Sequence, residues 1–167
     1  MKRELMWVIA AVPIVGWAAA TSADQDFFKQ AAEAGIAEVE AGNLAQSRGN
    51  SQAVKDFAAM MVKDHTDANA KLKSIAAGEN IDLPATSGAM HMASKAKLEV
   101  LKGDTFDKAY IKNQVAAHEQ TVGLLKKEIS SGSDSQAKSF AKETLPTVQE
   151  HLRKIRDIAA QAGVAAK

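Results

Sequence analysis

Apolar residues recur every three to four positions along most of the chain, which is the spacing of amphipathic helices. Breaks rich in glycine and serine divide this pattern into segments of similar length. The pattern predicts long helices over residues 26–48, 52–77, 105–129 and 134–162, and a shorter amphipathic helix over residues 87–101. The chain is therefore expected to be all-α.

Residues suited to helix ends lie at most of these boundaries. Ser22 or Asp24 precedes the first helix and Ser51 precedes the second, and such side chains accept hydrogen bonds from the free N–H groups of a first turn. Asp104 or Thr105 is expected to open the third long helix. A proline inside the last long helix, at position 146, is expected to kink it, because proline lacks a backbone donor and clashes with the preceding turn.

The lengths of the links predict how the helices are arranged. Short turns near residues 49–51 and 130–133 join the long helices in pairs, so each pair is expected to form an antiparallel hairpin. The link between the pairs spans about 25 residues, from Gly78 to Gly103, which is long enough to return the chain along the bundle. The predicted fold is a ferritin-like four-helix bundle with one long crossover that carries the short accessory helix.

The first 23 residues differ from the rest of the chain. Two basic residues near the amino terminus precede an apolar run over residues 5–20, and small residues follow. This layout is typical of a secretory signal peptide, here with cleavage after Ala20 or Ala23. An uncleaved membrane anchor is the alternative, because the apolar run could nearly span a bilayer. Cleavage is the favoured interpretation, and it leaves residues 24–167 as a single domain of a periplasmic protein without a stable membrane anchor.

Composition narrows the classes of partner. The 21 lysines and arginines are balanced by 20 aspartates and glutamates, and both signs are mixed along every segment, so nucleic acid is not an expected partner. The chain has no cysteine, so the exported protein must be held by its core alone and cannot be a lipid-anchored lipoprotein. An envelope protein is the partner class that fits these features.

Each long helix carries one polar residue on or near its apolar stripe, close to its middle. At about 100° per residue, His65 and His118 lie near the centres of their stripes, and His151 lies about 50° to one side. Glu38 falls toward the apolar side of its helix. Their similar heights predict one polar layer across the bundle. Three imidazoles and a carboxylate form a donor set for one transition-metal ion of the zinc, iron or copper class.

A buried polar layer can also be held by its own hydrogen bonds, without a metal. Four further polar residues are expected to complete such a layer or to surround the ligands: Asp64, Asn69, Gln114 and Thr144. Asp64 faces sideways on its helix, which favours an interhelical or capping contact over a ligand role. A proton-sensitive layer tuned by Glu38 is a third interpretation.

Enzymatic activity is not expected. Di-iron sites in helical bundles need Glu-x-x-His pairs, but the residues three before the histidines are Val62, Val115 and Val148. No Gly-x-Ser-x-Gly elbow or phosphate-binding loop is present either.

The crossover helix carries Met90-His91-Met92, a group of soft donors that would suit a cuprous ion. An exposed or partly packed stretch of helix is the competing interpretation of the same three residues.

Several motifs on all four long helices resemble one known family. In chain order they are EVEAGNLA from Glu38, VKDFAAMMVKDHTDANAKL from Val54, GDTFDKAY from Gly103, His118, and LPTVQEHL from Leu145. Over about residues 25–162 the chain is similar to the exported bacterial proteins of the DUF4142 family. The resemblance implies a ferritin-like four-helix fold and export, and it brings no established activity. The polar positions typical of that family are present at Glu38, Asp64, His65, Asn69, His118 and His151.

Two hypotheses about function follow. The first is a non-catalytic periplasmic bundle whose central His/Glu layer binds one transition-metal ion, in metal handling or envelope stress tolerance. The second is a structural or protein-interaction module of the cell envelope, with a metal-free polar layer and with the 87–101 helix as part of its contact surface.

Overall fold

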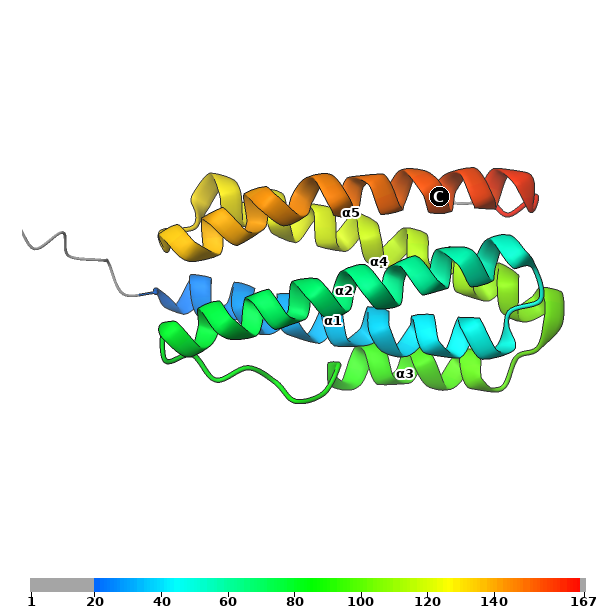
Figure 1. Cartoon of the computed structure of the whole chain (residues 1–167), viewed down its shortest axis with the longest axis horizontal. Coiled ribbons are helices and arrows are strands. Elements are labelled where there is room, and N and C mark those ends of the chain that lie inside the picture. The colour runs from blue at the N-terminus through cyan, green and yellow to red at the C-terminus, as the bar shows by residue number, and fades with distance from the viewer. Residues whose placement is uncertain (1–19, 166–167) are drawn as a thin grey trace, which may run out of the picture.

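Five helices account for most of residues 20–165, the part of the chain described by this computed structural model (Figure 1). They are α1 (Ser22–Arg48), α2 (Gln52–Gly78), α3 (Gly88–Glu99), α4 (Gly103–Ser131) and α5 (Ser135–Gln161). No residue between 20 and 165 belongs to a strand, so the prediction of an all-α fold is confirmed. The predicted signal peptide lies outside the described residues except for its last four positions.

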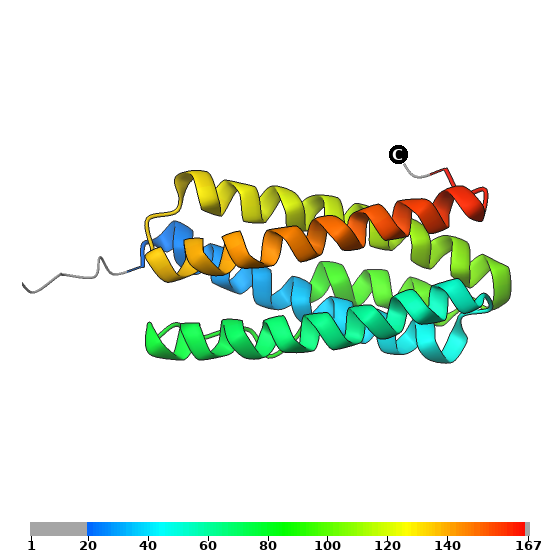
Figure 2. The ribbon, with the colours of Figure 1, turned by 45° about the horizontal axis from the view of Figure 1, so that its top comes forward.

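The four long helices lie along a common axis in two hairpins (Figures 1 and 2). α1 packs mainly against α2, and α4 packs mainly against α5. The crossover after α2 returns the chain along the bundle, so α2 and α4 run in the same direction. α3 is part of this crossover and lies on the outside of the bundle against α1 and α4. This is the arrangement that the link lengths predict. None of the helices between residues 20 and 165 is long and apolar enough to cross a membrane.

The start of α1 differs from the prediction. Thr21, rather than Ser22 or Asp24, is the N-cap, because its side chain accepts a hydrogen bond from the Asp24 backbone N–H. The Asp24 carboxylate in turn accepts from the Thr21 backbone N–H at 2.9 Å, which completes a capping box. The helix therefore begins before Asp24, the residue expected to open the domain.

The other helix ends follow the sequence signals more closely. Ser51 caps α2 by accepting a hydrogen bond from the Val54 N–H, as predicted. α4 begins one or two residues earlier than expected, at Gly103, whose positive φ of 58° is readily adopted only by glycine. Asp134 caps α5, and this helix continues without a break through Pro146.

α1 and α2 approach closely at Gly42. A Cβ atom on this residue would lie 2.8 Å from Cγ2 of Val62 and 3.0 Å from the backbone oxygen of Ala58. The absence of a side chain at Gly42 therefore sets the separation of the two helices at this point.

The buried apolar residues form two clusters at opposite ends of the bundle. One cluster includes Phe57 and Ile155, and the other includes Phe28 and Phe140. In each long helix one buried polar residue comes between residues of the two clusters, and these four are Glu38, His65, His118 and His151. A polar layer therefore divides the hydrophobic core.

Candidate metal centre

Three histidines from three helices converge in this layer. His65 comes from α2, His118 from α4 and His151 from α5, and they are 8%, 1% and 2% exposed. One ring nitrogen from each lies within 4.8 Å of the other two. Three atoms so placed share a point about 2.8 Å away, whereas a metal–nitrogen bond is about 2.0–2.1 Å long. Small rotations of the rings would therefore bring all three nitrogens to bonding distance of one ion.

Hydrogen bonds to the protein occupy one nitrogen on two of the rings. Nδ1 of His118 lies 2.9 Å from the backbone oxygen of Gln114, and Nε2 of His151 lies 3.0 Å from Oδ2 of Asp64. Because a carbonyl and a carboxylate only accept, these ring nitrogens carry the protons and donate. The opposite nitrogens, Nε2 of His118 and Nδ1 of His151, are buried without a partner in the described structure, and so is Nε2 of His65. Each histidine thus presents one free, buried ring nitrogen.

Glu38 lies beside this group of nitrogens. Its Oε2 accepts a hydrogen bond of 2.7 Å from the Gln114 side chain, and its Oε1 lies 3.8 Å from Nδ1 of His118. Glu38 thus contacts the ring nitrogen of His118 that is already hydrogen bonded, not the free one. Of the four residues predicted as ligands, the structure brings the three histidines together and places Glu38 on the outer side of His118.

Of the four polar residues predicted to surround the ligands, two contact the histidines and two do not. Gln114 and Asp64 contact the histidines directly through the hydrogen bonds described above. Asn69 instead packs against α1, where a Cβ atom on Gly35 would lie 1.8 Å from its Oδ1. Thr144 is partly buried on α5, two turns before His151. Within residues 20–165 no hydrogen bond joins Asn69 or Thr144 to the histidines.

Burial favours the neutral form of two of the rings, His65 and His151. It lowers the pKa of His65 to about 4, and the neighbouring His118 and His151 add to this effect, while Glu38 opposes it. Burial also lowers the pKa of His151, although Asp64 opposes that shift. A neutral imidazole has the free lone pair that a metal ion needs, so the site is ready to bind at neutral pH.

The surroundings of the histidines are apolar and aromatic, which sequence reasoning did not anticipate. The ring of Phe57 packs edge-on against His118 and His151, with centroids 6.2 and 6.5 Å apart. Phe57 also packs against the fully buried Tyr110, whose hydroxyl has no partner in the described structure. Helical spacing was the sequence signal that could have placed Tyr110 near the histidines, because it lies about two turns before His118 on the same stripe.

The three soft donors of α3 differ in their exposure to solvent. Met90 and Met92 are 74% and 53% exposed, and successive helical residues point about 100° apart, so the two thioethers project to different sides. The exposure of the two methionines fits the competing interpretation, an exposed stretch of helix. His91 is partly buried and lines, with Met90 and Glu38, a hollow of about 170 Å³.

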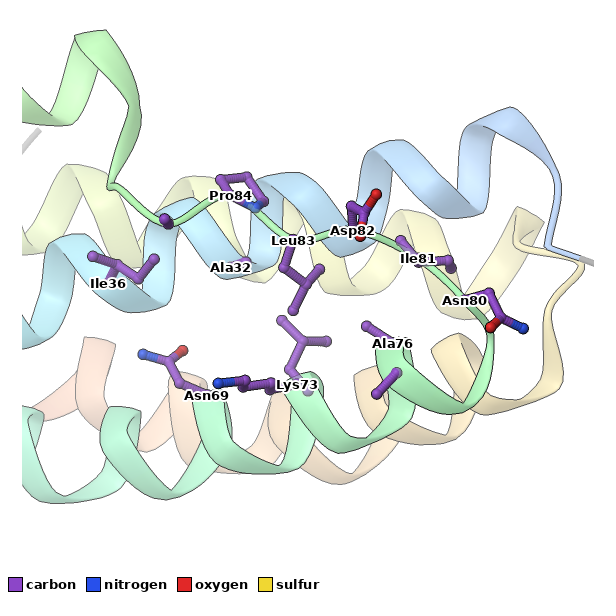
Figure 3. A pocket seen from close by; sticks show the side chains of 13 residues that line it. Ala32, Ile36, Asn69, Lys73, Ala76, Asn80, Ile81, Asp82, Leu83 and Pro84 are labelled. Carbon is purple, nitrogen blue, oxygen red and sulfur yellow. The ribbon is translucent and has the colours of Figure 1, made fainter.

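A separate groove of about 670 Å³ lies between α1, α2 and the first part of the crossover (Figure 3). Leu83 projects into it from the crossover, Ile36 lines it from α1, and Asn69 and Lys73 line it from α2. The three histidines do not line this groove. The largest part of its wall is apolar, and it contributes no donor atom to the candidate metal centre.

Comparison with protein families gives one match over most of the chain. The profile of the family described as Domain of unknown function (DUF4142) matches residues 14–158. Among curated proteins, none matches this chain.

Three solved structures share the fold, and two of them are of proteins named DUF305. A DUF305 protein from Streptomyces coelicolor is 17% identical, with a TM-score of 0.72 over 87% of this chain and 97% of that chain. A DUF305 fragment from Deinococcus radiodurans is 10% identical, with a TM-score of 0.76 over 86% and 99%. CopM in its Cu(I)-bound form is 14% identical, with a TM-score of 0.70 over 83% and 96%. At these identities the similarity supports the fold alone.

Proposed function

This chain belongs to the DUF4142 family of unknown function, and we propose that it is an exported metal-handling protein that binds one transition-metal ion through His65, His118 and His151. The observation that carries the proposal is the set of three buried ring nitrogens, one from each histidine, that lack a hydrogen-bond partner. A buried polar atom without a partner costs about 1–3 kcal/mol. Three such atoms in one layer are costly unless they share a ligand.

The hydrogen bonds made by the second ring nitrogens of His118 and His151 also fit a role as metal ligands. Ligating histidines commonly donate their second ring N–H to a carboxylate or a backbone carbonyl, which fixes the ring and raises its basicity. Asp64 provides the carboxylate for His151, and the carbonyl of Gln114 serves His118. Each of these hydrogen bonds fixes its ring and leaves the opposite ring nitrogen without a partner.

The charges near the site favour a cation. The Glu38 carboxylate lies 3.8 Å from Nδ1 of His118, and the Asp64 carboxylate lies 3.0 Å from Nε2 of His151. Two carboxylates behind neutral imidazoles balance the charge of a divalent ion without binding it directly. We therefore assign Glu38 to charge balance rather than to the ligand set.

Binding is a better assignment than catalysis. Three histidine ligands leave a fourth position open, as in catalytic zinc sites. The two hollows described above, of about 670 and 170 Å³, are not lined by the three histidines, which favours binding over catalysis in this proposal. Imidazole ligands suit zinc, copper and iron, and the fold is shared with a protein solved in a Cu(I)-bound form.

Export is part of the proposal. The amino-terminal segment has the charge and hydropathy pattern of a signal peptide, and a periplasmic location is the setting we propose for the mature chain.

Metal binding to the purified mature protein tests the proposal. After treatment with a chelator, the protein is titrated with Zn²⁺, Cu⁺, Fe²⁺ and Mn²⁺, and the bound metal and the thermal midpoint are measured. We expect one ion per chain and a raised midpoint with at least one metal. His65→Ala and His118→Ala should remove both effects, whereas His91→Ala on α3 serves as a control that keeps them. No stoichiometric binding of any of these metals to the folded wild-type protein would rule the proposal out.

A second candidate function rests on the outer surface of α3. Met90, Met92 and Val100 are large apolar side chains that are 74%, 53% and 80% exposed on or directly after this helix. Such residues would suit a contact with an envelope protein. In a pull-down from envelope extracts, this function predicts a partner that is lost when the three are replaced by serine and kept in His65→Ala.

A further inference from the structure

The start of α1 is joined to the turn between α4 and α5 at one end of the bundle (Figures 1 and 2). The carboxylate of Asp24, which is fully buried, makes this connection. Its Oδ1 accepts from the backbone N–H groups of Ser133 and Asp134, at 2.9 and 3.2 Å. Its Oδ2 accepts from the Ser133 hydroxyl at 2.7 Å, and from the Thr21 hydroxyl and backbone N–H at 2.6 and 2.9 Å.

Two more buried carboxyl groups lie in the same place. Glu128 is 6% exposed and Asp134 is 3% exposed, and Oε1 of Glu128 is buried without a hydrogen-bond partner. Burial and the nearby charge of Asp24 raise the pKa of Glu128 to about 7. Among the ion pairs formed within residues 20–165, none involves these three carboxyl groups. The charge of Lys138 lowers the pKa of Glu128 slightly, but Lys138 forms no ion pair with it, so within residues 20–165 the cluster lacks a directly paired positive charge.

We propose that signal peptidase cleaves the chain between Ala20 and Thr21, and that the new α-ammonium group of Thr21 is the cation of this carboxyl cluster. The inference rests on the export proposed above. Water adds across the Ala20–Thr21 peptide bond, so that the leader leaves with a carboxylate on Ala20 and the Thr21 amine takes up a proton. The Thr21 nitrogen lies 2.9 Å from Oδ2 of Asp24, so in the folded mature chain its ammonium group is in contact with a carboxylate.

The alternative cleavage, after Ala23, conflicts with the structure. It would remove Thr21, and with it the N-cap of α1 and two of the hydrogen bonds to Oδ2 of Asp24. It would also remove Ser22 and Ala23, which already belong to the helix. Cleavage after Ala20 keeps the capping box whole, and it places alanines at the first and third positions before the cut, which is the small-residue pattern that signal peptidase recognises.

The exposed position of Thr21 favours a charged amine at the start of α1. Thr21 is exposed while Asp24 is buried, so the charged amine keeps part of its hydration and contacts the cluster from its solvent side. A lysine brought to the same place would have to order a long side chain, whereas the terminal amine is held by the backbone of the cap itself.

Expression of the full chain in a bacterial host that exports it, followed by intact mass and amino-terminal sequencing of the periplasmic protein, tests the cleavage site. A mature chain that begins at Thr21 is expected. A chain that begins at Asp24 overturns this inference and leaves export intact, whereas an unprocessed chain overturns both. Neither result depends on metal binding, so the metal proposal is tested separately.

The role of the ammonium is tested by acetylating the terminal amine of the mature chain, which keeps its length and removes the charge. With metal absent, the thermal midpoint of the free-amine chain at pH 7 should exceed that of the acetylated chain by about 2–4 °C. Glu128→Gln, which removes the carboxyl group without a partner, should reduce this difference. Equal midpoints for the free and acetylated chains would overturn the assignment of the ammonium to the cluster.

Discussion

Asp64 on α2 and His151 on α5 are joined across the bundle by a contact of 3.0 Å between Oδ2 and Nε2. This contact fixes the tautomer of His151, because the ring must donate from Nε2, and it leaves Nδ1 buried without a partner. Asp64 thereby orients one of the three proposed ligands and is not itself assigned to the ligand set.

Asp64→Asn should weaken metal binding by about 10–100-fold, because the neutral amide no longer raises the basicity of His151 or balances the charge of the ion. The affinity is measured by competition with a chelator of known strength, under conditions in which the variant is folded. Asp67→Asn is the matched control, since Asp67 is an exposed acid on the same helix that pairs with Lys63. Equal affinities for wild type and Asp64→Asn would contradict the role assigned to Asp64.

The metal-free protein should lose stability in mild acid because of His65. The pKa of this ring is about 4 in the folded protein and about 6.5 in the unfolded chain, so between these pH values the unfolded state binds more protons. The stabilising contribution is thus fully present above pH 6.5 and is lost as the pH falls toward 4. The loss amounts to about 3 kcal/mol, from the difference between the two pKa values.

Urea unfolding at several pH values between 7 and 4, with a chelator present, measures this loss. His65→Gln should show a flatter dependence on pH, while His91→Gln, on the outer helix, should follow the wild type. A His65→Gln variant with the full acid dependence of the wild type would show that the loss arises elsewhere.

His65→Leu should stabilise the metal-free protein by about 1–2 kcal/mol at neutral pH, because it removes a buried ring nitrogen that has no partner. The same variant should lose the rise in thermal midpoint that metal gives to the wild type. Chemical denaturation with and without metal distinguishes the two hypotheses for the layer. If the layer is a structural network, His65→Leu is instead destabilising and no metal-dependent rise exists to lose.

Gly42→Ala should destabilise the protein by about 1–3 kcal/mol, because the new methyl group would press against Val62 and the backbone oxygen of Ala58. Gly123→Ala is the matched substitution, since this glycine also lies within a helix but a Cβ atom there meets nothing within 4 Å. It should stabilise the protein by about 0.5–1 kcal/mol through helix propensity. Equal effects of the two substitutions in denaturant titrations would show that the α1–α2 separation is not set at Gly42.

The helical period made the histidine layer predictable. In a long amphipathic helix the spacing gives both the direction of a side chain and its height, so His65, His118 and His151 could be placed together before any coordinates. The link lengths predicted the parallel directions of α2 and α4 for a similar reason, since a short turn permits only a hairpin.

The details that depend on rotamers and on distant segments could not be predicted. Glu38 points toward the layer as expected, but its carboxylate pairs with Gln114, and this choice depends on the packing of α1 against α4. The cap of α1 is Thr21 because Asp24 is held by the α4–α5 turn, more than a hundred positions away in sequence. Helical spacing carries no information about such long-range contacts.

The three histidines are divided between the two hairpins. His65 belongs to the α1–α2 hairpin, while His118 and His151 belong to the α4–α5 hairpin. An ion bound by all three would cross-link the hairpins at the level where the hydrophobic core is interrupted. Separation of the two hairpins would then require release of the ion. Hydrogen exchange of the backbone amides would therefore be slower in both hairpins, and it would occur through the same opening event. Metal supply in the envelope would thus set the kinetic lifetime of the folded bundle.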